Sequence, residues 1–248
     1  METYHKIQTL FKRDMDGSIT GKKGKMIEGE WTTPELEYLA GLEWEFTEKV
    51  DGTNIRIHYR PSVATPVGFT QQIDFAGRTD NAVIPKHLLQ YLEETFTYDL
   101  FKPVFPDLDV HGVILFGEGY GPKIQGGGKY RSDTSFVLFD VKIGDFWLSR
   151  ENVNDIASKL GIDSVPVIGH GTLYQAINYV KYGTPYLPEE INSIVSKDGY
   201  SGWLSQLAGL KSQWGDHEAE GIVARPVVDL FNRKGERIIT KVKCIDFK

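Results

Sequence analysis

The chain has 248 residues, of which 40% are hydrophobic, 25% charged and 12% aromatic, a composition typical of a globular protein with its own core. Its apolar runs are too short to cross a membrane, and its polar N-terminus lacks the apolar segment of a signal peptide, so no membrane association is expected. The single cysteine, Cys244, excludes an internal disulfide and a cysteine-rich zinc site, which favours a cytoplasmic location.

The charge is unevenly distributed along the chain. A net charge of −6 argues against a protein that coats nucleic acid without specificity. Near the N-terminus, however, basic residues lie close together among glycines: Lys12, Arg13, Lys22, Lys23 and Lys25. Two interpretations remain open for this segment: a solvated loop without a ligand, or a surface that contacts phosphates.

The predicted elements are mostly short strands, with helices placed irregularly between them. Apolar runs bounded by turn residues predict strands at residues 54–59, 112–117, 136–141, 221–225 and 238–244. Helical spacing of apolar residues predicts helices at residues 85–96, 150–160, 172–182 and 188–196. This order predicts an α+β fold with antiparallel sheets and flanking helices. Because no repeat or linker marks a boundary, a single domain over residues 1–248 is expected.

A lysine stands between two strand-like runs, in the sequence Glu48-Lys49-Val50-Asp51-Gly52-Thr53-Asn54. The Asp-Gly pair is a turn signal, so the segment by itself is equally typical of a hairpin with a solvated lysine.

Further polar residues follow in chain order at the ends or on the faces of predicted strands. They are Arg78 after an apolar pair, Glu118 at a strand end, Phe139-Asp140 within a strand, Glu220 at a strand start, and Lys241 and Lys243 on one face. Each also has an ordinary structural explanation. A carboxylate at a strand end is usually solvated, a phenylalanine in an apolar strand usually packs in the core, and a pair of lysines on a strand can prevent aggregation of a sheet edge.

Taken together and in this order, the motifs resemble those of the covalent nucleotidyltransferase superfamily, which contains ATP-dependent DNA ligases, RNA ligases and mRNA capping enzymes. The matching order is Lys-x-Asp-Gly, Gly-Glu, Phe-Asp, Glu-Gly-x-Val and Lys-x-Lys, from Lys49 to Lys243. Within the superfamily, the run Glu-Gly-Tyr-Gly-Pro-Lys-Ile-Gln-Gly that starts at Glu118 is similar to a signature of RNA ligases. Asn54 and the Gly-Arg-Thr segment around Arg78 resemble the bacteriophage RNA ligase 2 branch.

The resemblance implies a nucleotide cleft in an ATP-grasp-like ligase fold, with ATP and Mg²⁺ or Mn²⁺ as cofactors. It implies that a lysine takes AMP from ATP, passes it to the 5′-phosphate of an RNA end, and that a 3′-hydroxyl then attacks and releases AMP. The alternatives are a GTP-dependent capping guanylyltransferase, a DNA ligase, or a nucleotide- or RNA-binding module without turnover.

The resemblance also assigns expected roles to individual residues. Lys49 would be the nucleophile, and Lys241 and Lys243 would grip the phosphate and favour the neutral amine of the nucleophile. Asp51 and Asp140 would support the residues that contact the nucleotide or orient a metal ion, and Asp51 is expected to act with the catalytic lysines. Nucleotide contacts are expected from Glu48, Asn54, Arg78, Glu118, Phe139, Glu220 and Val223, and Glu118 and Glu220 would hold a metal ion, in part through water.

Two features depart from the family pattern. The sequence ends five residues after Lys243, without the oligonucleotide-binding or helical C-terminal domain of the larger ligases, so a nucleotidyltransferase domain alone is expected. Two explanations are open: the protein is a minimal ligase, or a partner protein supplies the RNA binding that the C-terminal domain provides in larger ligases. Arg225 occupies a position where RNA ligases usually have lysine, and the forked guanidinium is not equivalent to an ammonium group.

Overall fold

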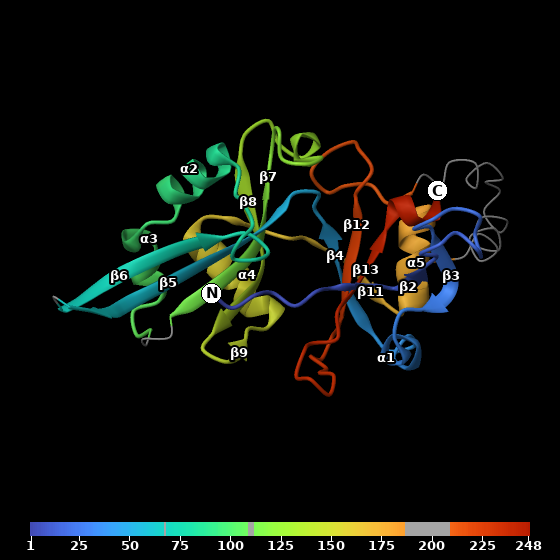
Figure 1. Ribbon diagram of the computed structural model, residues 1–248, viewed down its shortest axis with the longest axis horizontal. Coiled ribbons are helices and arrows are strands. Elements are labelled where there is room, and N and C mark those ends of the chain that lie inside the picture. The colour runs from blue at the N-terminus through green and yellow to red at the C-terminus, as the bar shows by residue number, and fades with distance from the viewer. Residues whose placement is uncertain (67, 109–111, 187–208) are drawn as a thin grey trace, which may run out of the picture. The chain divides into compact units, whose positions relative to one another are not determined.

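The computed structural model describes residues 1–66, 68–108, 112–186 and 209–248 (Figure 1). The chain forms two compact units. Unit 1 consists of Met1–Tyr4 and Val50–Val165, and unit 2 consists of His5–Lys49 and Pro166–Lys248. The chain therefore passes from one unit to the other three times, and one of these crossings directly follows Lys49.

Unit 1 is built on a sheet with the strand order β10-β8-β7-β5-β6, and β9 pairs with the C-terminal end of β8. Its strands are β5 (Thr53–Thr65), β6 (Gly68–Ala76), β7 (Val113–Tyr120), β8 (Ser135–Ile143), β9 (Phe146–Trp147) and β10 (Asp163–Ser164). Its helices are α2 (Lys86–Thr95), α3 (Tyr98–Val104), α4 (Arg150–Leu160) and the 3₁₀ turn η1 (Gly127–Lys129). All pairings are antiparallel except that of β10 with β8.

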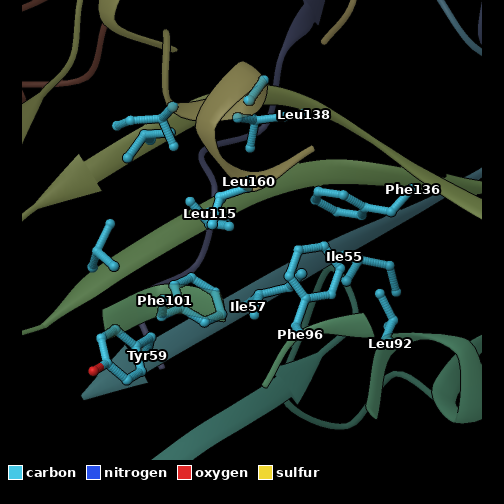
Figure 2. Packing of buried hydrophobic residues seen from close by; sticks show 14 of the residues in the cluster. Ile55, Ile57, Tyr59, Leu92, Phe96, Phe101, Leu115, Phe136, Leu138 and Leu160 are labelled. Atoms are coloured by element: carbon cyan, nitrogen blue, oxygen red, sulfur yellow. The ribbon is translucent and has the colours of Figure 1, made fainter. Parts of the chain in front are cut away.

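The core of unit 1 lies on one face of this sheet, beneath the helices (Figure 2). Along β5, Ile55, Ile57 and Tyr59 point into it, as the alternation of apolar and polar residues predicts. Tyr59 stacks on Phe101 of α3, with 4.7 Å between the ring centroids. The other face of β5 therefore carries Asn54, Arg56 and His58, and Asn54 is one of the candidate site residues of unit 1.

Unit 2 contains a sheet with the order β1-β13-β12-β4-β11, and a separate two-stranded sheet of β2 and β3. The strands are β1 (Gln8–Thr9), β2 (Phe11–Arg13), β3 (Met26–Trp31), β4 (Trp44–Lys49), β11 (Val167–Gly171), β12 (Gly221–Pro226) and β13 (Thr240–Lys243). The helices are α1 (Pro34–Tyr38), α5 (Leu173–Tyr182) and the 3₁₀ turn η3 (Cys244–Phe247). Among the large sheet's pairings only β1 with β13 is parallel.

The core of unit 2 lies between this sheet and α5. Trp44 and Phe46 of β4, Ile222 of β12 and Val242 of β13 pack with the apolar face of α5. Alternate residues of the same strands therefore face away from α5, and the lysines of β4 and β13 are among them.

The predicted α+β class and antiparallel sheets are confirmed, and each predicted strand overlaps an observed one, although β5 continues six residues beyond the predicted end at residue 59. The helix predicted at residues 150–160 is confirmed with its caps, since the Ser149 hydroxyl accepts the Asn152 N–H and Gly161 has φ 64°. The helices at residues 85–96 and 172–182 correspond to α2 and α5, whereas the one at 188–196 lies outside the described residues. No helix in the described ranges is long and apolar enough to span a membrane.

Candidate active site

The hairpin interpretation of the Lys49 segment is wrong. Strand β4, which ends at Lys49, pairs with β12 and β11 in unit 2. Strand β5, which begins at Thr53, pairs with β6 and β7 in unit 1. The three residues after Lys49 thus connect two different sheets, and Lys49 is the last residue of a central strand.

In unit 2, one carboxylate holds two lysines. Gly221 at the start of β12 lies opposite Lys49 of β4 on one side and Lys243 of β13 on the other. The preceding residue, Glu220, accepts from Lys49 Nζ at 2.6 Å through Oε2 and from Lys243 Nζ at 2.5 Å through Oε1. All three side chains remain partly accessible, with 21%, 29% and 16% exposure for Lys49, Lys243 and Glu220.

The register of the sheet extends this cationic face by one row. Val223 lies opposite Lys241 of β13 and opposite Thr47 of β4. Because side chains alternate along a strand, Val223 and Lys241 project on the same face as Lys49 and Lys243. Arg225 lies two residues further along β12 and is buried. The face therefore carries Lys49 and Lys243 on one carboxylate, with Lys241, Val223 and Thr47 in the next row.

Glu48 points to the other face of the sheet. It is 1% exposed, and one of its carboxylate oxygens accepts the Gln213 N–H at 2.7 Å, with the Ser212 hydroxyl as a further donor. Its Oε1 has no hydrogen-bond partner among the residues that the structure describes. Burial raises the pKa of the Glu48 carboxyl above its ordinary value of 4.5, although these hydrogen bonds oppose the shift.

This burial leads to a prediction for Glu48→Gln. A carboxyl whose pKa is raised by folding lowers the free energy of unfolding only at pH values where that carboxyl is ionised in the unfolded chain. For Glu48 this loss of stability therefore appears as the pH rises above about 4.5. We expect Glu48→Gln to have wild-type stability at pH 4 and to be more stable than wild type at pH 7, measured by thermal unfolding. Glu37→Gln on the exposed side of α1 is the control and should show no gain. Equal stability of Glu48→Gln and wild type at pH 7 would contradict the prediction.

In unit 1, Asn54 and Glu118 lie opposite each other on β5 and β7, on the face away from the helices. The side-chain Oδ1 of Asn54 is buried and has no partner in the described part of the chain. A buried acceptor without a donor is costly, so this atom is a natural position for a ligand hydroxyl or amine to donate a hydrogen bond.

A β-bulge carries Phe139 on the same face. Phe116 of β7 pairs with Asp140 and Gly117 with Leu138, so Phe139 is the extra residue of β8. Its carbonyl, which the bulge frees from the ladder, accepts from Arg150 Nη1 at 3.0 Å. The Tyr4 ring lies edge-on to Phe139 at 5.2 Å between centroids, and its hydroxyl donates to Asp140 at 2.7 Å. Tyr4 and Arg150 thus hold the half-buried Phe139 ring in place.

Arg56 positions the segment that contains Arg78. The Arg56 side chain is fully buried and donates to the Gly77 carbonyl at 2.7 Å and to Asp80 at 2.8 Å. It also donates to the carbonyls of Met1 and Glu2, both at 2.9 Å. Arg78 itself is exposed at the tip of the loop that these bonds hold.

Asp51 anchors the loop with the RNA ligase-like signature. Its Oδ2 accepts the Gly126 N–H at 3.1 Å, and a Cβ on Gly126 would collide with this carboxylate. Within the loop Lys123 and Gln125 have φ values of 65° and 47°, a conformation that costs energy for residues other than glycine. Such strain persists only where surrounding contacts impose it, and Asp51 supplies one of them.

The structure therefore groups the predicted site residues by unit. Unit 2 brings together Lys49, Glu220, Val223, Lys241 and Lys243, with Glu48 on the opposite face of the sheet. Unit 1 brings Asn54, Glu118 and Phe139 to one face of its sheet and places Asp51 and Arg78 on its loops.

For a divalent metal, the described residues contain no cluster of three or more His, Cys, Asp or Glu side chains. Glu118 belongs to unit 1 and Glu220 to unit 2. Single carboxylates fit Mg²⁺, which keeps several waters and takes its other ligands from phosphates.

Sequence reasoning missed three residues that hold the candidate site: Tyr4, Arg56 and Arg150. Arg56 carried one signal, because a charged residue two positions after Asn54 shares its face of the strand. Tyr4 and Arg150 carried none, since their partners lie 136 and 11 residues away along the chain.

The fold agrees with the comparisons to known proteins. The model of the RNA ligase family matches residues 42–243, and the chain belongs to this family. The fold is similar to that of a Naegleria gruberi RNA ligase mutant solved with ATP and Mn, with a TM-score of 0.54 and 14% identity over 86% of this chain and 52% of that one. It is also similar to an archaeal ATP-dependent RNA ligase, with a TM-score of 0.51 and 16% identity over 98% of this chain and 48% of that one.

The chain thus spans about half the length of the RNA ligases whose structures it matches. No curated protein matches the sequence.

Proposed function

We propose that the protein is an ATP-dependent RNA ligase that carries AMP on Lys49, and that both units together form one nucleotidyltransferase domain. The observation that carries the proposal is the Glu220 carboxylate between the amines of Lys49 and Lys243. An ordinary surface lysine does not require a shared ion pair at the end of a central strand, whereas a nucleophile must be held in a defined position.

The chemistry follows from the charges on this face. The ion pair with Glu220 holds the Lys49 amine at a defined position, and attack on the α-phosphate of ATP requires that the amine leave this pair. The positive charges of Lys241 and Lys243 would stabilise the negative charge that develops on the phosphate oxygens. In this proposal the Lys49 nitrogen bonds to the α-phosphate as pyrophosphate leaves, and the AMP is later passed to a 5′-phosphate of RNA.

In unit 1, Phe139 would stack on the adenine base and the Asn54 Oδ1 would accept a hydrogen bond from the nucleotide. The burial of the Asn54 acceptor without a partner supports this role. Arg78 would contact ribose or phosphate, while Asp51 would hold the signature loop. A divalent cation, Mg²⁺ or Mn²⁺, would neutralise phosphate charge when bound, with Glu118 or Glu220 as its carboxylate. The presence of ATP and Mn in the Naegleria gruberi structure supports both cofactors for this chain.

The role of Glu48 is the least direct. Its unpartnered, buried Oε1 supports a hydrogen bond from a nucleotide amine, although the side chain lies on the opposite face from Lys49. Glu48→Gln keeps the shape and removes the charge. If Glu48 serves the nucleotide, this variant combines its gain in stability with weaker labelling by ATP.

A covalent labelling experiment tests the function. The protein is incubated with MgCl₂ and either α-labelled ATP or α-labelled GTP, and the products are separated on a denaturing gel. Label from ATP alone is expected. Label from GTP would support a capping guanylyltransferase, and no label from either would refute the enzyme. Sealing of a nicked RNA duplex, a single-stranded RNA and a nicked DNA duplex then identifies the polymer, with RNA 5′-phosphate and 3′-hydroxyl ends as the expected substrate.

A further inference from the structure

The connection between β2 and β3 of unit 2 is an ordered loop that carries three lysines (Figure 1). Its organising residue is Asp14, which is buried at the end of β2. The Asp14 carboxylate accepts the N–H groups of Gly17, Ile19 and Thr20 at 2.9, 2.9 and 2.6 Å, and the Thr20 hydroxyl at 2.9 Å. These bonds hold the pKa of Asp14 well below its usual range, so the carboxylate stays ionised and the loop stays closed around it.

The base of the loop is fixed as well. The backbone N–H of Asp14 donates to the Lys25 carbonyl at 2.8 Å, and that of Gly24 donates back to Asp14 at 2.6 Å. Arg13 donates to the Gly24 carbonyl at 3.0 Å and to Asp246 of η3 at 2.6 Å. The loop is therefore attached at both ends to the body of unit 2, while its lysine side chains remain exposed to solvent.

The charges of this region are distributed so that three lysines have no acidic partner among the residues that the structure describes. Lys12 pairs with Glu30 and Arg13 with Asp246, while the charge of Asp14 is enclosed by backbone N–H groups. Lys22, Lys23 and Lys25 are exposed, and none of them forms an ion pair with another residue in the described part of the chain. Apart from Asp14, the loop contains one carboxylate, the exposed Asp16, which accepts the Ser18 N–H. The surface is thus locally positive in a chain with a net charge of −6.

The kind of donor that this surface offers determines the kind of anion that it can bind. A compact phosphate site uses converging backbone N–H groups, but in this loop Asp14 already occupies them. The groups left to bind an anion are the three long, flexible lysine side chains, which extend from a fixed loop. Such side chains suit the successive phosphates of an extended polyanion. The loop belongs to the same unit as Lys49, and it follows β1, whose residue Thr9 pairs with Lys241.

We propose that Lys22, Lys23 and Lys25 bind the sugar–phosphate backbone of the RNA substrate. The inference rests on the proposed ligase function for the identity of the polyanion. It predicts that the lysines act in RNA binding and in sealing, and that they take no part in the transfer of AMP to the protein.

The test compares the triple variant Lys22→Ala/Lys23→Ala/Lys25→Ala with wild type in binding a fluorescent 5′-phosphorylated RNA at several salt concentrations. Each lost phosphate contact should reduce the slope of log K against log salt by about 0.7, so a reduction of about 2 and a loss of affinity of about tenfold or more at low salt are expected. Covalent labelling by ATP should be unchanged.

The matched control is Lys86→Ala/Lys102→Ala/Lys159→Ala in unit 1, which removes the same charge from exposed positions. It should bind RNA like wild type. A triple loop variant with the wild-type slope and affinity would overturn the proposal, as would an equal loss in the control or a wild-type protein that does not bind RNA. Failure of the ligase proposal appears separately, as absence of ATP label from wild type, because that step needs no RNA.

Discussion

In the Lys49→Arg variant, covalent labelling by ATP is expected to fall to background, at least about a thousandfold below wild type, as when other enzymes lose their nucleophile. Arginine keeps the positive charge and can keep the ion pair with Glu220, which lies 2.6 Å from the lysine amine. Its guanidinium does not lose its proton in proteins, so it cannot attack a phosphate. The substitution therefore separates the nucleophilic role of Lys49 from its structural one.

Two further measurements make the Lys49→Arg result specific. Thermal unfolding should stay close to wild type, since the charge and the strand are retained. Lys211→Arg, in the same unit and paired with Asp216 on the surface, is the control and should be labelled like wild type. Labelling of Lys49→Arg at more than a few per cent of the wild-type level would rule out Lys49 as the attachment site.

The Arg56→Met variant should lose about 3 kcal/mol of stability in urea unfolding, because the buried or part-buried carbonyls of Gly77, Met1 and Glu2 lose their donor at a cost of about 1 kcal/mol each. The Asp80 carboxylate is 63% exposed and adds little, since water can replace the lost donor. Methionine fills part of the space, so a cavity contributes little. We also expect faster hydrogen exchange in the segment from Gly77 to Asp80, since Arg56 ties this segment to the sheet.

The control for Arg56 is Arg60→Met on the same strand. Arg60 pairs with Asp74 at 2.5 Å, but both side chains are about one-third exposed, so the loss should be under about 1 kcal/mol. Equal losses in the two variants would show that Arg56 is an ordinary surface-type ion pair and that the Arg78 loop does not depend on it.

The strands and helices were predictable where the periodicity was strong and the ends carried caps. The helix α4 begins and ends where Ser149 and Gly161 indicate, because capping depends only on residues within one turn. The pair Lys241 and Lys243 was placed correctly on one face of β13, because alternation is a local property of a strand. The short strands β1 and β2 had no such signal in two or three residues.

The candidate site was predictable as a set of residues, through the order of its motifs, but not as a geometry. The sequence showed Glu220 as a carboxylate before a strand, whereas its pairing with both Lys49 and Lys243 follows from the order β13-β12-β4. Likewise, Phe139 was expected within a strand, but its bulge depends on the register between β7 and β8.

By itself, then, the sequence determined the α+β class, the faces of the main strands and the membership of Lys49 in an ordered set of motifs, since these depend on local periodicity and on chain order. Only the tertiary structure decided that the residues after Lys49 join two sheets and do not form a hairpin. It alone also paired Glu220 with both Lys49 and Lys243 and closed the basic loop around Asp14. These outcomes depend on hydrogen bonds between segments far apart in the chain, which no local pattern of residues specifies.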